Sequence, residues 1–284
     1  MVFAGCAAAQ TLFLQDGHFP SWSPDGSSII CNRIQGATED SDIFAWTVGS
    51  SGGEVDTLLA DPSGVWYPQW LPDGERIVYH RTRRDSISTV YEFVVRDPRG
   101  STAVVWSVPA FWHDAAFRLS SDGALVIYTT LQGGRTLWTL DVASGATAAL
   151  RPGTDGHISP DGQWIAFTID GSVAVAPVSG GAERRIEPGS SPCWTPDGRS
   201  IVFTGAGAHG YVDLILLNIE DGSRKQLTDD AAMDLRSSVS PDGHTVAFVK
   251  TLDDDYGPFD LWLVDLESTA ARSVSWSGIK SVFR

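Results

Sequence analysis

The sequence is short of positive charge, of cysteine and of long apolar runs. Its 284 residues carry 35 Asp and Glu against 20 Lys and Arg, for a formal charge of −15. Nucleic acids and anionic membrane surfaces are bound through clustered Lys and Arg, and no run of cations here exceeds two residues. We therefore expect no nucleic-acid partner. The absence of any run of about 18 apolar residues excludes a membrane-spanning helix.

Three cysteines cannot form a disulfide framework. Cys31 lies in an apolar run and Cys193 precedes Trp194, so both are predicted to be small buried hydrophobic residues. No Cys-x-x-Cys pair or His–Cys cluster indicates a zinc site. Glycine (29) and proline (15) are plentiful, which favours many short strands and turns over long helices.

A five-residue phrase recurs six times along the chain. Its common form is Trp-Ser-Pro-Asp-Gly, and its copies end at Gly26, Gly74, Gly123, Gly162, Gly198 and Gly243. Successive copies lie 48, 49, 39, 36 and 45 residues apart, which matches the length of a four-stranded propeller blade. Proline sets φ and Asp-Gly supplies the turn, because glycine takes a positive φ without steric cost. The third copy has Ser121 in place of the proline, which weakens that turn.

Each copy of the phrase is surrounded by strand patterns. An apolar strand follows the turn, as in 77–79 and 201–203, and a third strand follows that one, as in 260–264. A hairpin turn then leads to a fourth, more polar strand. Such units can bury both faces only by stacking in a closed ring. The sequence therefore predicts an all-β fold: a six-bladed β-propeller of four-stranded antiparallel blades.

Ring closure is also predicted by the sequence. Residues 11–17 resemble the outer-strand segment 224–230, so we expect this N-terminal strand to complete the last blade. Residues 272–276 form a competing strand after the sixth repeat, and the two alternatives stay open.

The repeated phrase and the Ile/Val-Ala-Phe-like strand after it resemble the WD-like β-propeller repeat of TolB-type proteins, over about residues 10–276. The resemblance implies a propeller of the bacterial envelope. In TolB, which is periplasmic, an additional N-terminal α/β domain binds other Tol proteins and the propeller binds the peptidoglycan-associated lipoprotein. The repeats leave no room for that extra domain within these 284 residues. The same propeller occurs in prolyl-oligopeptidase-like peptidases and in oligogalacturonate lyases.

The first residues suggest a targeting signal. Residues 2–9 are small and apolar around Cys6, as at the end of a bacterial lipoprotein signal peptide, where the cysteine is lipidated. The alternative is an ordinary small-residue terminus. We accordingly assign 1–9 to a signal-peptide remnant or disordered N-terminus, and 10–284 to a single TolB-like propeller domain. If Cys6 carries a lipid, the protein is anchored to a membrane surface in the periplasm or cell envelope.

No catalytic signature stands out. The Gly-x-Ser-x-Gly nucleophile elbow of serine hydrolases is absent. A Gly-x-Gly-x-x-Gly match at 205–210 is followed by a strand rather than a helix, so we interpret it as a loop.

The start of each innermost strand should line one mouth of the central channel. Those positions hold a mixture of aromatic and polar residues, and the candidate ligand-binding set is His18, Trp66, Tyr67, His113, Asp114, His157 and Arg236. Phe19, Asp155, Ser191 and Asp234 lie at similar positions. Aromatic side chains mixed with a few polar groups are typical of binding sites.

The residues at this channel mouth lead to two hypotheses about function. The leading hypothesis is a non-catalytic envelope propeller that binds a protein or peptide, without a cofactor. The alternative is a metal-dependent polysaccharide lyase or hydrolase of the oligogalacturonate-lyase-like type. It would hold a divalent metal through His18, His113 or His157 with nearby aspartates. The charge of −15 disfavours a polyanionic substrate.

Overall fold

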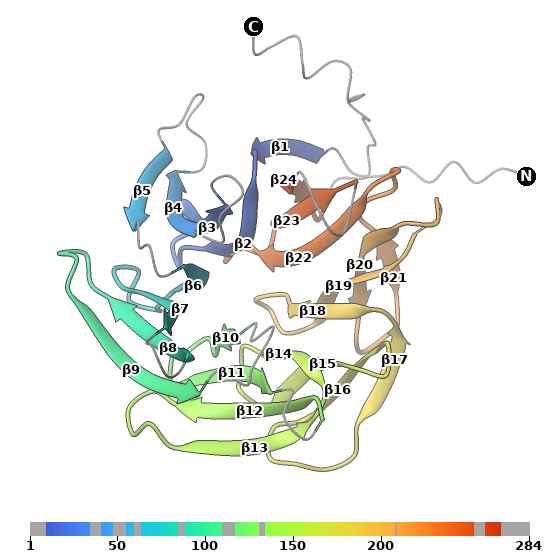
Figure 1. Ribbon diagram of the computed structural model, residues 1–284. Helices are drawn as coiled ribbons and strands as arrows, with labels where there is room; N and C mark the ends of the chain where they lie inside the picture. Colours follow the sequence, from blue (N-terminus) through green and yellow to red (C-terminus); the bar gives the residue numbers. More distant parts are fainter. Residues whose placement is uncertain are drawn as a thin grey trace, which may run out of the picture.

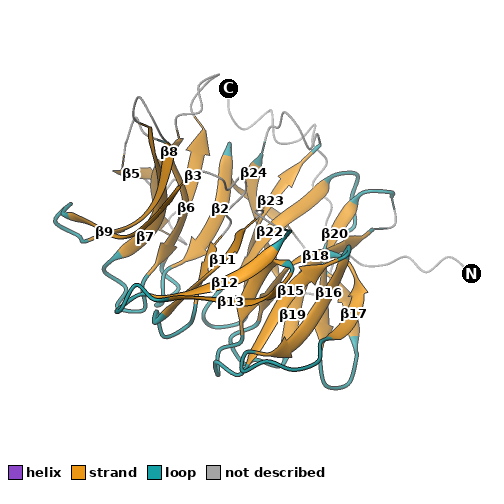
Figure 2. Ribbon diagram, turned by 60° about the horizontal axis from the view of Figure 1, so that its bottom comes forward, coloured by secondary structure: helices purple, strands orange, loops and turns teal. Residues whose placement is uncertain are grey.

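A computed structural model describes residues 10–34, 41–47, 55–59, 64–84, 89–109, 117–130, 134–207, 209–252 and 259–267. The elements within these ranges are strands, joined by loops and turns (Figure 2). No helix in the described part of the chain is long and apolar enough to cross a membrane. The all-β prediction is confirmed.

The strands form six four-stranded antiparallel sheets arranged around a centre (Figure 1). The innermost strands are β2 (Gly17–Trp22), β6 (Val65–Trp70), β10 (Phe117–Leu119), β14 (Thr154–Ile158), β18 (Ser190–Trp194) and β22 (Met233–Val239). The second strands are β3 (Ser28–Ile34), β7 (Ile77–Arg84), β11 (Leu125–Thr130), β15 (Trp164–Ile169), β19 (Ser200–Ala206) and β23 (Thr245–Thr251).

The third and outermost strands complete each sheet. The third strands are β4 (Ser41–Thr47), β8 (Thr89–Arg96), β12 (Thr136–Asp141), β16 (Ser172–Pro177), β20 (Val212–Asn218) and β24 (Asp260–Asp265). The outermost strands are β5 (Val55–Leu59), β9 (Thr102–Pro109), β13 (Thr147–Pro152), β17 (Arg184–Pro188), β21 (Arg224–Gln226) and, in the last sheet, β1 (Gln10–Leu14).

The N-terminal strand closes the ring, as the sequence predicts. Strand β1 pairs antiparallel with β24, with Leu12 opposite Trp262 and Leu14 opposite Leu261. The last sheet therefore combines the two ends of the repeat region. The competing strand predicted over 272–276 lies outside the described residues, as does Cys6 with its neighbours.

The hydrophobic core lies between neighbouring sheets. Each of six clusters draws its side chains from two adjacent sheets. One of them packs Leu14, Ala247 and Leu261 of the last sheet against Trp22 and Ile29 of the first. Since each sheet buries one face on each neighbour, stacking continues around the whole ring.

The repeated phrase forms a hydrogen-bonded turn after each innermost strand. In the first copy, Ser23 Oγ donates to Asp25 Oδ1 (2.6 Å), the Ser27 N–H donates to the same oxygen (3.0 Å), and Gly26 has φ of 72°. The hydrogen bonds from Ser23 and Ser27 lower the pKa of the exposed Asp25 to about 2. Serine or threonine donates to aspartate in the same way in four further copies.

Candidate functional site

A cavity of about 780 Å³ follows the axis of the ring and is lined by the six innermost strands and the turns after them. Most of its lining residues fall into three rings when each repeat is counted back from its glycine. The bulge ring, seven residues back, is Phe19, Tyr67, Asp155, Ser191 and Arg236. The middle ring, five residues back, is Ser21, Gln69, Arg118, His157, Cys193 and Ser238. The turn ring, two residues back, is Pro24, Pro72, Ser121, Pro160, Pro196 and Pro241.

The bulge ring owes its place to a repeated backbone distortion. Its members have φ between 52° and 56°, in the left-handed region that non-glycine residues rarely occupy. Each lies where the pairing of the innermost strand with the second strand shifts register, for example between His18 and Ser21. Such a bulge places two residues opposite one and redirects side chains. Strain of this kind costs about 1–3 kcal/mol per residue and concentrates at functional sites.

Neighbouring sheets hold two of these distorted residues in place. The Tyr67 N–H donates to Asn32 Oδ1 (2.8 Å), and the Ser191 N–H donates to Thr168 Oγ1 (3.0 Å). Asn32 and Thr168 occupy the same position of their repeats, six residues after the turn glycine. The bulge geometry is therefore stabilised from the preceding sheet.

The bulge ring forms one end of the cavity, where two aromatic rings and an arginine side chain stack on one another. The guanidinium of Arg236 lies 4.2 Å from the centre of the Phe19 ring, and the Phe19 and Tyr67 ring centres are 4.0 Å apart. Arg236 Nη1 lies 3.2 Å from His18 Nδ1. Burial, together with the charge of Arg236, lowers the pKa of His18 to about 4, so this imidazole is neutral at pH 7. The result is an apolar platform with a positive charge at one end.

The middle ring holds a second cation. Arg118 Nη2 donates to the Ser237 carbonyl oxygen (3.2 Å), which joins β10 to β22. These strands belong to sheets on opposite sides of the centre (Figure 1). Gln69 fixes the backbone on both sides of this arginine, since its Nε2 donates to the Phe117 carbonyl oxygen (2.6 Å) and its Oε1 accepts from the Leu119 N–H (2.8 Å).

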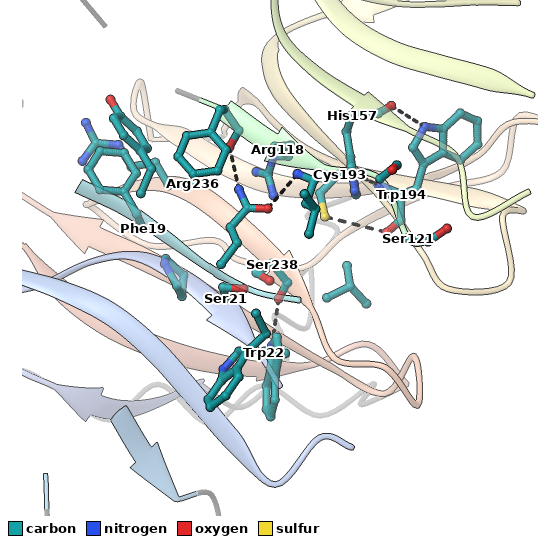
Figure 3. Close-up of a pocket in the computed structure, with 18 of the residues that line it drawn as sticks. Phe19, Ser21, Trp22, Arg118, Ser121, His157, Cys193, Trp194, Arg236 and Ser238 are labelled. Carbon is teal, nitrogen blue, oxygen red and sulfur yellow. Dashed lines mark hydrogen bonds between the residues drawn. The ribbon is translucent and has the colours of Figure 1, made fainter. Parts of the chain in front are cut away.

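His157 lies beside Arg118 on the wall of the same cavity (Figure 3). Its Nδ1 accepts the Trp194 N–H (2.9 Å), and the Trp194 indole donates to the His157 carbonyl oxygen (3.0 Å). Burial and the charge of Arg118 lower the pKa of His157 to about 3. The neutral ring therefore carries its proton on Nε2, because Nδ1 is the acceptor.

The structure brings together part of the predicted ligand-binding set. Tyr67, His157 and Arg236 line the cavity, as do Phe19, Asp155 and Ser191. His18 and Trp66 are not among the residues that line it, although His18 lies 3.2 Å from Arg236. Each of them immediately precedes a bulge residue, Phe19 or Tyr67. His113 and Asp114 lie outside the described residues.

Sequence reasoning missed the middle ring apart from His157. Gln69, Arg118 and Cys193 line the cavity, and the prediction that Cys193 and Cys31 are buried is confirmed. The signal was present, because each middle-ring residue stands five places before a turn glycine. This spacing identifies cavity residues only when it is known which face of the innermost strand points to the axis.

The described part of the predicted metal-binding set does not fit a divalent cation. Arg236 stands beside His18 and Arg118 beside His157, and each guanidinium would repel a metal ion at its imidazole. Among the described residues, no three His, Cys, Asp or Glu side chains are placed to hold one ion. Asp234 is fully buried next to Lys250 and does not line the cavity.

Asp234 belongs to a charge cluster that joins the last sheet to β20 of the sheet before it. Lys250 Nζ lies 3.5 Å from Asp234 Oδ1 and also bonds Asp230, while Asp213 and Asp229 add further negative charge. Burial raises the pKa of Asp234 to about 7 despite the attraction of Lys250, and burial raises that of Asp213 to about 6.

We expect this cluster to make stability depend on pH. Above the ordinary pKa of aspartate and up to about pH 7, the folded chain keeps the Asp234 proton that the unfolded chain releases, so the free energy of unfolding falls as pH rises. Asp234→Asn should make this slope shallower, with the remainder due to Asp213. Urea unfolding at pH 5 and pH 8 measures it, and Glu220→Gln on the exposed surface is the control. An unchanged slope in Asp234→Asn would contradict the assignment.

The ring of four-stranded sheets around an axial cavity defines a β-propeller. No protein-family model matches the sequence. TolB from Acinetobacter baumannii has a similar structure, with a TM-score of 0.63 and 16% identity over 91% of this chain and 65% of that one. Oligogalacturonate lyase from Vibrio parahaemolyticus matches with a TM-score of 0.61 and 12% identity, over 93% and 98% of the two chains.

A third similar structure is the acylaminoacyl peptidase of Pyrococcus horikoshii. Its TM-score is 0.59 at 13% identity, over 94% of this chain and 46% of that one. This chain thus spans 65% of the length of the Acinetobacter TolB and less than half of the peptidase. At such low identities these matches establish a TolB-like propeller fold, and the fold is shared by proteins of different function.

Proposed function

We propose that this protein is a non-catalytic, six-bladed TolB-like propeller of the bacterial cell envelope. It binds a protein or peptide partner where the bulge ring opens the axial cavity. The observation that carries the proposal is the stack of Arg236, Phe19 and Tyr67, since two of these side chains are large aromatics held in a strained backbone conformation. Aromatic and arginine side chains dominate the binding energy of protein interfaces.

The envelope location is supported by two features. The small-residue segment around Cys6 resembles a lipoprotein signal, and the fold is similar to that of TolB. Under this proposal Cys6 carries a lipid that anchors the propeller to a membrane surface.

Capture of partners from a bacterial envelope extract tests the binding face. The wild-type protein is compared with the double variant Tyr67→Ala/Arg236→Ala by quantitative mass spectrometry. We expect partner recovery to fall about tenfold or more, as for loss of interface hot spots. The matched control is Tyr211→Ala/Arg135→Ala, which removes the same two residue types at exposed positions outside the cavity. Equal recovery by wild type and the Tyr67/Arg236 variant would defeat the proposed face.

The alternative is a metal-dependent polysaccharide lyase of the oligogalacturonate-lyase type. The match to that enzyme over 98% of its length favours it. The two guanidinium groups beside His18 and His157 oppose it. Incubating the protein with oligogalacturonate and Mn²⁺, and following the absorbance of unsaturated product, separates the two functions. Product formed by wild type and lost in His157→Ala would replace the binding proposal.

A further inference from the structure

The middle of the axial cavity contains a cation without an acidic partner among the described residues. Arg118 makes its hydrogen bond to a neutral carbonyl oxygen, that of Ser237. A guanidinium carries five N–H donors, and the other middle-ring residues are the neutral Ser21, Gln69, His157, Cys193 and Ser238. A charge removed from bulk water is stabilised when it is paired. This position therefore favours an anionic ligand.

Several groups that line the cavity with Arg118 can donate hydrogen bonds. His157 presents an Nε2–H, because its Nδ1 accepts the Trp194 N–H. Ser21 on β2 and Ser238 on β22 add hydroxyl groups to the cavity from the sheets across the axis (Figure 3). Two N–H donors and hydroxyls suit a carboxylate, which accepts hydrogen bonds at both oxygens.

The position of Arg118 is preorganised. Gln69 bonds the backbone on both sides of it, and the bond to Ser237 directs its side chain across the axis. A donor group that is already ordered loses little conformational entropy when a ligand binds. The site is thus built before the ligand arrives.

We propose that Arg118 and His157 form a carboxylate subsite that binds an acidic side chain or the terminal carboxylate of an extended peptide. The inference rests on the proposed function and defines the chemistry of its ligand. An apolar residue of the same peptide would lie against Phe19 and Tyr67 at the bulge ring. A polyuronate is disfavoured, because it carries a carboxylate on every unit and the chain has a formal charge of −15.

A pooled library of random N-acetylated hexapeptides tests the subsite. Half of the library has a free C-terminus and half a C-terminal amide, and a second portion is methyl-esterified so that all its carboxylates are neutral. Peptides captured on the immobilised full chain are sequenced by mass spectrometry. We expect capture to favour peptides with a carboxylate, and the free and amidated halves show whether a terminal or a side-chain carboxylate is bound.

Variants assign the effect to Arg118. Arg118→Gln should reduce capture of carboxylate peptides by about tenfold or more, and Arg118→Lys should restore part of it. Arg99→Gln, at an exposed position outside the cavity, is the matched control. The comparison of free with esterified peptides on wild type needs no variant, so it holds even if Arg118→Gln folds poorly.

The outcomes separate this subsite from the proposed function. Equal capture of esterified and free peptides, still lost in Tyr67→Ala/Arg236→Ala, would overturn the subsite and leave the binding face standing. If the wild-type protein captures no more peptide than the Tyr67→Ala/Arg236→Ala variant does, both the subsite and the proposed binding face are contradicted. Binding of oligogalacturonate without any peptide would assign the cavity to acidic glycans and overturn the peptide proposal.

Discussion

Replacing Gly153 by alanine is expected to lower the free energy of unfolding by about 3 kcal/mol, because the new Cβ meets both a strained backbone and a filled space. Gly153 has φ of 138° and precedes β14. A Cβ built there would lie 2.7 Å from Phe167 Cδ2 and 2.9 Å from the Thr168 carbonyl oxygen. The backbone oxygen cannot move aside without breaking the pairing of β14 with β15.

The control for Gly153 is another glycine with a positive φ but open surroundings. Gly162 has φ of 74° and no atom within 4 Å of an added Cβ, so Gly162→Ala should cost only about 1–2 kcal/mol. Thermal unfolding compares them, and the difference should amount to several degrees. If both variants lose the same free energy of unfolding, the close contact of Gly153 with β15 does not contribute to the cost of the substitution.

The Gly153 prediction extends to the next repeat and to the cavity. Gly189 precedes β18 in the same way, and its added Cβ would lie 2.6 Å from the Thr204 carbonyl oxygen. These glycines let β14 and β18 start close to their second strands. The cavity-lining residues Asp155, His157 and Ser191 follow these glycines within a few positions. The close contact of each glycine with the second strand of its sheet therefore also positions the cavity wall.

Leu14→Asp is expected to open the ring, with a loss of about 3–5 kcal/mol in the free energy of unfolding. Leu14 lies on β1, is buried, and packs in the cluster that joins the last sheet to the first. An aspartate there would place a charge among Trp22, Ile29 and Leu261 with no hydrogen-bonding partner in that cluster. Because β1 closes the ring, its release exposes the faces of two sheets at once.

The neighbouring residue provides the control for Leu14. Gln15 is exposed, so Gln15→Asp introduces the same charge without burying it and should change stability little. Urea unfolding measures the loss, and limited proteolysis near the N-terminus detects release of β1. Equal stability of Leu14→Asp and Gln15→Asp would show that β1 does not hold the ring closed.

Ring closure and ligand binding depend on the same packing. The axial cavity exists only because six innermost strands face one centre, and Arg118 reaches from β10 to β22 across it. The bulge ring combines two large aromatics and an arginine from different sheets. A variant that opens the ring should therefore lose both stability and the proposed binding face.

Local sequence was enough to establish the class of fold and the order of its strands. The turn phrase, its spacing and the apolar strands after it depend on neighbouring residues, so each repeat could be recognised separately. The closing strand was also predictable, because residues 11–17 resemble an outer strand that lacks a blade. Tyr67, His157 and Arg236 were placed near the axis by the same register argument.

Only the three-dimensional packing decided which side chains reach the cavity. His18 and Trp66 were candidates, but Phe19 and Tyr67, the bulge residues that follow them, line the cavity in the structure. The bond from Arg118 to Ser237 spans 119 residues of sequence, and Lys250 bonds both Asp230 and Gln10, which lie far apart in the sequence. Such contacts depend on how separate sheets close around an axis, which no local pattern of residues encodes.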